Sequence, residues 1–271
     1  MSVLSVDLAY RRWSDLGVVI LDQEPQAQSL HRGGVKRPSI ACEIVPFAAT
    51  GPDGKICANR VNAVRVDAEI LAGRLNDLCA ARGIRVMMLD GPQAWKSGDS
   101  GLRHARVSER ELNTAAKTGL PGVVTPRTYR TFAEFCIDVY DALCRRGWKR
   151  LSSRGRGAMP HERVLVESYP YAAWKSLGLR PLCSKRRARV SDLAECHGAL
   201  RSLIPFTTNR PPNHDQLQAI VGGLAGLALE GREMRALRIV GDPPRREDGH
   251  WREGFIVLPA RPVESALRWM N

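Results

Sequence analysis

The first third of the chain alternates between short apolar runs and polar connections. Three runs with the length and alternation of β-strands lie at 3–9, 16–21 and 40–47. Between 66 and 82, apolar residues recur at helical spacing, and Gly83 stands where a helix C-terminal glycine belongs. The nearly continuous apolar run 84–89 is typical of a strand buried on both faces. This pattern predicts an antiparallel meander of three strands, then a helix, then a buried strand.

The rest of the chain predicts further helices with strands between them. Residues 91–107 are polar and contain glycine, which indicates a loop, and the capping-box spacing from Ser108 to Glu111 predicts a helix that ends near 118. Helices are also predicted at 129–146, just before Gly178, at 191–203 and at 215–230, and strands at 163–168, 237–240 and 255–258. No internal repeat or clear linker is present. We therefore predict one α/β domain over 1–271, with insertions at about 91–107 and 144–189.

Four acidic residues lie where a predicted strand ends or a predicted helix begins. They are Asp7, Asp90, Glu167 and Asp215. A carboxylate at the end of a buried strand is unfavourable unless a positive group meets it, and carboxylate oxygens suit hard cations such as Mg²⁺ or Mn²⁺. We therefore expect these side chains to converge at one edge of the sheet. Asp7, Asp90 and Asp215 would be metal ligands, with Glu167 as a ligand or general base.

Each of these acids also has a structural interpretation. Asp7 could pair with an arginine or accept from a backbone amide, and Asp90 could cap the turn that follows it. Asp215 could be the N-cap of its helix. The candidates for an ion pair with Glu167 are Arg163 and Lys175. Glu43, which alternates within the third strand, is a weaker candidate that is predicted to face solvent.

The formal charge of +13 is concentrated in one part of the chain. Between Cys144 and Arg189, thirteen Lys or Arg stand against two acids, a net of +11. Such a segment attracts polyanions, of which nucleic acid is the commonest, although a solvated arginine-rich surface is the alternative. The residues predicted to contact nucleic acid are Lys96, Arg103, Arg106, Lys185, Arg186 and Arg187. Tyr169, Tyr171 and Trp174 could stack on unpaired bases or belong to the core.

Other features narrow the class of protein. The longest uncharged apolar stretch, 219–229, is too short to span a bilayer. The N-terminus lacks the pattern of a signal peptide, which favours a cytoplasmic protein with no membrane partner. The seven cysteines form no CxxC pair and mostly fall inside apolar patterns, so we expect reduced thiols in the core and neither disulfides nor a zinc site.

A set of spaced motifs also carries a family resemblance. In chain order they are Asp7, Leu-Asp-Gly-Pro at 89–92, the polar helix 109–119, Glu-Ser-Tyr-Pro at 167–170, Asp-Gln-Leu-Gln-Ala at 215–219 and the strand at 254–259. The order of elements resembles the ribonuclease H-like fold, and the motifs resemble the family called domain of unknown function 429, described as predicted nucleases. The resemblance implies a mixed sheet, with three antiparallel strands and then parallel strands, flanked by helices.

The last predicted helix departs from that family. Proteins that this chain resembles often have the pattern Asp-x-x-Asp-Ala at this helix. In this chain Gln218 stands at the position of the second acid. An amide oxygen binds a cation more weakly than a carboxylate, so a second metal ion is less well supported. His214 could be a further ligand or proton carrier, or could face solvent.

The predicted function is a nuclease that acts on DNA or RNA with Mg²⁺ or Mn²⁺. The alternative is a catalytically weak nucleic-acid-binding protein that keeps the same fold. A phosphotransferase of the actin-like sugar kinase type is disfavoured because no glycine-rich phosphate hairpin follows Asp7.

Overall fold

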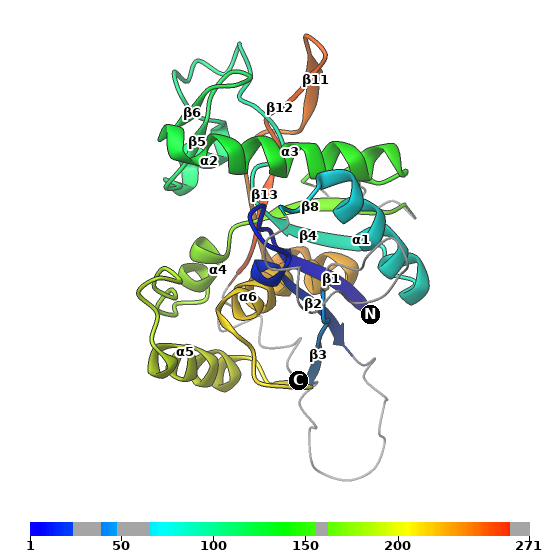
Figure 1. Ribbon diagram of the computed structural model, residues 1–271, viewed down its shortest axis with the longest axis vertical. Helices are drawn as coiled ribbons and strands as arrows, with labels where there is room; N and C mark the ends of the chain where they lie inside the picture. Colours follow the sequence, from blue (N-terminus) through cyan, green and yellow to red (C-terminus); the bar gives the residue numbers. More distant parts are fainter. Residues whose placement is uncertain (24–38, 48–64, 155–161, 261–271) are drawn as a thin grey trace.

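A mixed β-sheet with helices on both faces organises the chain (Figure 1). The computed structural model describes residues 1–23, 39–47, 65–154 and 162–260. Along the sheet the strands are β10 (Leu237–Val240), β13 (Ile256–Pro259), β8 (Val164–Ser168), β4 (Val86–Asp90), β1 (Ser2–Asp7), β2 (Gly17–Gln23), β3 (Ile40–Ile44) and β9 (Phe206–Thr208). β1, β2 and β3 are antiparallel neighbours, and β4 and β8 follow on the other side of β1 as parallel strands. The predicted mixed sheet is therefore present.

Two hydrophobic cores form because successive side chains of a strand point to opposite faces of the sheet. On one face, Val3 and Met88 pack with α6 (His214–Glu230), α4 (Pro170–Ser176) and α5 (Val190–Leu203). On the other face, Leu4 and Met87 pack with α1 (Ala68–Arg82) and α3 (Arg130–Arg145). Both faces of β1 and β4 are thus covered, which explains why their sequences are almost continuously apolar.

Helix α6 lies close against β1 and β2 because its sequence carries glycine on the side that meets the sheet. A Cβ atom at Gly223 would lie 2.7 Å from the Cβ of Ser5, so a larger residue would push the helix away. The hydroxyl of Ser5 donates a hydrogen bond of 2.6 Å to the carbonyl of Ala219. These contacts hold the beginning of α6 near the carboxyl end of β1.

The segment after Asp90 differs from the predicted loop because it packs into the protein. Residues 91–97 are buried except Pro92, which is partly exposed. The backbone of Trp95 forms hydrogen bonds with the backbones of Trp251 and Glu253. The helix predicted at 108–118 is shorter than expected: α2 spans Val107–Leu112 and ends at Asn113, which has the left-handed conformation (φ 49°).

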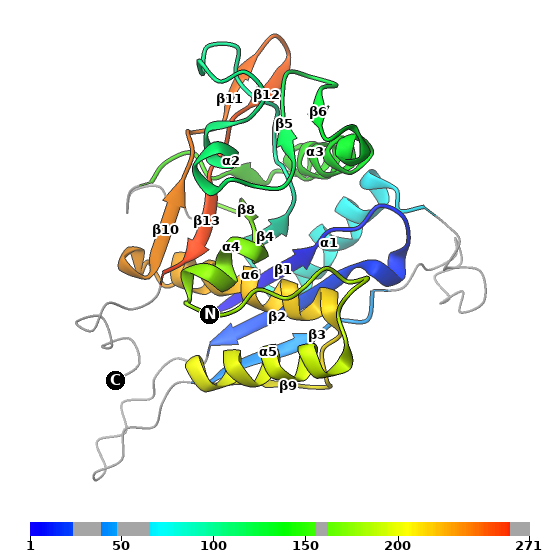
Figure 2. The same ribbon diagram turned by 90° about the vertical axis from the view of Figure 1, so that its left-hand side faces the viewer.

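The structure also contains short strands that the apolar pattern did not predict. They are β5 (Lys117–Thr118), β6 (Val124–Thr125), β7 (Lys149–Arg150), β11 (Arg245–Glu247) and β12 (His250–Arg252), in addition to β9. Figures 1 and 2 both place the hairpins β5–β6 and β11–β12 together with α2 at one end of the molecule. In the described part of the chain, no helix is long and apolar enough to cross a membrane.

Candidate functional site

Asp7 and Asp90 lie side by side at the carboxyl ends of two adjacent parallel strands. β1 and β4 pair with Asp7 opposite Asp90, so both side chains leave the same face of the sheet. The two carboxyl groups are joined by a hydrogen bond, and each side chain remains partly exposed at its strand end. The structure thus brings together two of the four acids that the sequence singles out.

Burial raises the pKa of both carboxyls, and the charges of neighbouring acids raise it further. Desolvation is the largest cause for Asp7, whose pKa lies well above its usual value, and the charges of Asp90 and Asp215 raise it further. Desolvation raises the pKa of Asp90 to about 7, where the hydrogen bond with Asp7 acts to lower it and the charge of Glu167 to raise it. The pair therefore retains a proton near neutral pH unless a cation is supplied.

Asp215 reaches this neighbourhood because α6 begins directly against the first residue of β2. Gly17 pairs with Asp7 in the sheet, and a Cβ at Gly17 would lie only 2.2 Å from the backbone oxygen of Asp215. The N-cap of α6 is Asn213, whose side chain accepts from the amide of Gln216. Asp215 is therefore not the N-cap, and its carboxylate is free to interact with other side chains.

The carboxylate of Asp215 is bound by two neighbouring side chains. The ammonium of Lys185 lies 2.5 Å from one oxygen and also 2.9 Å from Asp15, while Nδ1 of His214 lies 3.2 Å from the other oxygen. Nε2 of His214 lies 2.9 Å from the carbonyl of Cys183. Burial acts to lower the pKa of His214, but the hydrogen bonds with Asp215 and Cys183 outweigh it and raise that pKa. His214 therefore orients Asp215 and does not face solvent.

Glu167 is held by an arginine instead of facing the Asp7–Asp90 pair. In the β4–β8 register Glu167 is opposite Leu89, and Ser168 is opposite Asp90, so Glu167 points to the other face of the sheet. Both its oxygens accept from Arg106 at 2.7 Å, and one also accepts from the amide of Gln93. The ion-pair partner of Glu167 is thus Arg106, and not Arg163 or Lys175 as predicted.

Two of the six residues predicted to contact nucleic acid are buried inside the protein. Arg106 is 1% exposed and forms ion pairs with Glu167 and Glu109, and Lys96 is 5% exposed and donates to the carbonyl of Ser97 at 2.6 Å. Neither side chain lies where a nucleic acid backbone can reach it, because the segment after Asp90 folds back into the protein. The four at the surface are Arg103, Lys185, Arg186 and Arg187.

The aromatic residues after β8 have different environments. Trp174 is fully buried and belongs to the core, and its indole donates a 2.8 Å hydrogen bond to the side-chain oxygen of Gln218. That oxygen, considered above as a weak metal ligand, is therefore already engaged. Tyr171 is 46% exposed, whereas Tyr169 is partly buried and its hydroxyl accepts from the amide of Ala115.

Sequence reasoning missed two contributors to this region. Lys185 was predicted to bind nucleic acid and not to pair with Asp215, and Glu109 was not recognised as a partner of Arg106. The only local signal for the second was the three-residue spacing of Arg106, the N-cap of α2, and Glu109 in its first turn. Among the described residues, no group of three or more His, Cys, Asp or Glu side chains is arranged to hold a metal ion.

Without divalent cations, the protein is expected to lose stability as pH rises from about 4 to above 7. A carboxyl whose pKa is higher in the folded than in the unfolded state makes the folded state bind more protons, so the free energy of unfolding falls with rising pH. For Asp90, a rise from 3.8 to about 7 corresponds to a loss on the order of 4 kcal/mol. Urea unfolding in EDTA between pH 4.5 and 8 measures it.

Variants separate this effect from the titration of other groups. Asp90→Asn should flatten the pH dependence between about 4 and 7, the window between the unfolded and the folded pKa of Asp90. Asp77→Asn, an exposed aspartate on α1, should leave the wild-type slope unchanged. Identical slopes for the wild type and Asp90→Asn would show that the pair does not carry a raised pKa.

Comparisons with known proteins do not assign this chain to a family. No protein-family model matches the chain, and no curated protein matches it. Among solved structures, the chain is similar to RuvC of Thermus thermophilus at 10% sequence identity, over 86% of this chain and 96% of that chain, with a TM-score of 0.38. A likeness of this degree does not by itself establish a common fold or function.

Proposed function

We propose that this chain is a nuclease with a ribonuclease H-like fold that hydrolyses phosphodiester bonds in DNA or RNA with Mg²⁺ or Mn²⁺. The observation that carries the proposal is the Asp7–Asp90 pair. Two carboxylates meet at adjacent strand ends, and neither forms an ion pair with a lysine or arginine in the described residues. A divalent cation would neutralise the pair and replace its shared proton.

The strand order supports the fold assigned in this proposal. Three antiparallel strands, β3, β2 and β1, are followed across the sheet by parallel β4 and β8, which is the arrangement that the resemblance implies. This order puts the carboxyl ends of β1 and β4 next to each other, and α6 brings Asp215 to the same end. Acids far apart in the sequence thereby meet.

The donor set fits a hard cation. Asp7 and Asp90 supply anionic oxygens, and Asp215 joins them if Lys185 moves away. A bound Mg²⁺ or Mn²⁺ would supply a hydroxide nucleophile and stabilise charge on the leaving oxygen. His214 keeps Asp215 oriented, while the exposed side chains of Arg186 and Arg187 attract the phosphate backbone.

The direct test is an assay of the purified chain on single-stranded, duplex, hybrid and branched oligonucleotides. Cleavage is expected with Mg²⁺ or Mn²⁺ and not in EDTA. If no substrate is cut with either ion, or if EDTA leaves the rate unchanged, the proposal of a metal-dependent nuclease is wrong.

A second function, nucleic-acid binding with little or no catalysis, is favoured by the ion pair between Lys185 and Asp215. Together with the hydrogen bond from Trp174 to Gln218, it leaves two carboxylates instead of three or four for a metal. Binding that weakens steeply with salt, in the absence of cleavage, would support this second function.

Lys185→Met is expected to increase the affinity for Mn²⁺. Removing the ammonium frees the carboxylate of Asp215 and takes away a positive charge that repels the cation, so the dissociation constant should fall by about 3- to 10-fold. Titration calorimetry on the protein without nucleic acid measures this. The control is Arg187→Met, an exposed neighbour. Equal or weaker affinity in Lys185→Met would show that Asp215 is not part of the metal site.

A further inference from the structure

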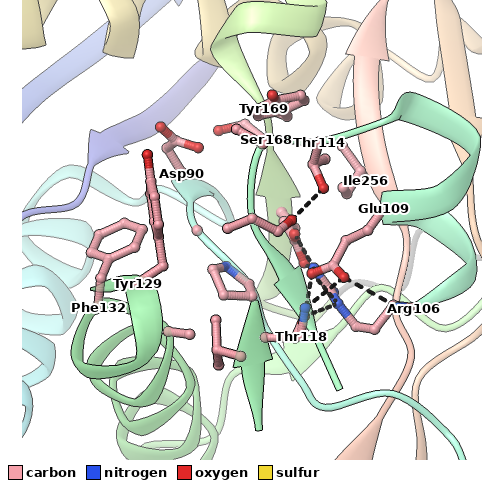
Figure 3. Close-up of a pocket in the computed structure, with 17 residues that line it drawn as sticks. Asp90, Arg106, Glu109, Thr114, Thr118, Tyr129, Phe132, Ser168, Tyr169 and Ile256 are labelled. Carbon is pink, nitrogen blue, oxygen red and sulfur yellow. Dashed lines mark hydrogen bonds and ion pairs between the residues drawn. The ribbon is translucent and has the colours of Figure 1, made fainter. Parts of the chain in front are cut away.

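A cavity of about 220 Å³ opens beside the Asp7–Asp90 pair, and the function proposed above does not use it. Asp90, Gly91 and Ser168 line one side, so the cavity starts at the carboxyl ends of β4 and β8. It extends between the first turn of α3 and the segment that joins α2 to β5 (Figure 3). Any group bound in it would therefore lie next to one member of the carboxylate pair.

The walls of this cavity are mainly apolar and include three aromatic rings. Figure 3 shows Tyr129 and Phe132 on one side and Tyr169 with Ile256 on the other. The ring of Tyr169 is fixed in place because its hydroxyl accepts from the backbone amide of Ala115. Aromatic rings in the walls of a cavity are suited to a flat heterocycle, because every nucleobase presents a π-face to stack on.

The size of the cavity admits one base and not a base pair. A protein cavity of about 150 Å³ holds a benzene ring, and this one is moderately larger. A base that enters it must be free of its Watson–Crick partner, as in a single strand, or must be turned out of a duplex, which requires energy for unpairing.

The polar end of the cavity does not offer free groups for reading the identity of a base. Arg106, Glu109 and Glu167 line this end, but they are bonded to one another, and Glu109 also accepts from the amide of Thr118 at 2.8 Å. Stacking is then the main source of recognition, and stacking tolerates any of the bases.

We propose that this cavity binds a single unpaired nucleobase of DNA or RNA and thereby places the adjoining phosphate at the Asp7–Asp90 pair. The proposal rests on the proposed function and specifies its substrate class as single-stranded or locally unpaired nucleic acid. A base held beside Asp90 keeps its own sugar and phosphate within one nucleotide of the two carboxylates.

The test is equilibrium binding in EDTA, so that no cleavage or metal is required. Fluorescein-labelled oligonucleotides of one length are compared as single-stranded DNA, single-stranded RNA, perfect DNA duplex and the same duplex with one bulged base. The single strands and the bulged duplex should bind about 10-fold more tightly than the perfect duplex. The two single-stranded arms show whether DNA or RNA is preferred.

Two variants report on the cavity itself. Tyr129→Ala removes a wall residue that is 42% exposed, and Ala116→Leu fills the space from a partly exposed position. Each should lower single-strand affinity by about 5- to 10-fold, the loss of one stacked base, with little change for the perfect duplex. Ile70→Ala is the control, since Ile70 is an apolar residue on α1 that is 58% exposed and does not line the cavity.

The outcomes separate this proposal from the nuclease proposal. Equal affinity for the perfect and the bulged duplex, or equal losses in Tyr129→Ala and Ile70→Ala, would overturn the base-binding cavity even if the protein cleaves DNA. A preference for unpaired bases that both cavity variants abolish would support it even if no cleavage is found with any metal.

Discussion

Asp7→Asn is expected to abolish metal-dependent cleavage while making the metal-free protein more stable at pH 8. The substitution removes an anionic ligand from the pair, which should lower the cleavage rate by about 10³-fold or more. It also removes the carboxyl of Asp7, whose pKa is raised by burial and by the charges of Asp90 and Asp215, so the folded state gains stability at a pH where that carboxyl would otherwise be ionised. Loss of activity together with a gain in stability cannot be explained by misfolding.

Three measurements check this expectation. Single-turnover cleavage gives the rate, urea unfolding in EDTA at pH 8 gives the stability, and a melting curve with and without Mn²⁺ reports metal binding. The wild type should melt higher with Mn²⁺, and Asp7→Asn should not. Asp77→Asn, exposed on α1, should match the wild type in all three. If Asp7→Asn cleaves at the wild-type rate, the pair is not the catalytic centre.

Arg106→Met is expected to be the most destabilising single change at the edge of this site. It would leave Glu109 and Glu167, whose side chains are 5% and 4% exposed, without a cation. Breaking a buried ion pair from one side costs about 3–5 kcal/mol, because the remaining charge stays buried and unpaired. The cost should shrink at pH 4, where the orphaned carboxyls become protonated.

Urea unfolding at pH 7 and pH 4 measures this effect. Arg103→Met is the matched control, because Arg103 lies three residues earlier on the same segment and is exposed, and its cost should be within about 0.5 kcal/mol. Arg106→Lys should lose an amount of stability between those of Arg106→Met and Arg103→Met. A lysine keeps the positive charge, but it lacks the planar guanidinium that donates to two carboxylates at once. Equal losses for Arg106→Met and Arg103→Met would contradict the buried network.

Much of the fold was predictable because the longer helices and strands have a regular spacing of apolar residues along the sequence. The helices at 66–82 and 129–146 correspond to α1 and α3 within two residues at each end, and the apolar run at 84–89 corresponds to β4. The missed strands, such as β5 and β7, have two residues each. A strand of two residues has no periodicity, since its pairing partner alone makes it a strand.

The two aspartates of the carboxylate pair were also predictable, because each interrupts or ends an apolar strand. Their side-by-side placement requires only that β1 and β4 be parallel neighbours, an arrangement in keeping with the mixed sheet that the family resemblance implied. Lys96 and Arg106 were not predictable in the same way. A basic residue in a polar, glycine-containing segment is usually solvated, and nothing local shows that Glu167, sixty-one positions away from Arg106, will pair with it.

The amino-acid sequence determines the longer strands and helices of this protein and the two acids that end β1 and β4, because these depend on spacing along a single element. Tertiary structure alone decides the charge state and access of each candidate group. Lys185 binds Asp215, Trp174 binds Gln218, and Arg106 binds Glu167. Each contact joins segments distant in the chain, so their consequences for desolvation and ion pairing exist only once the chain has folded.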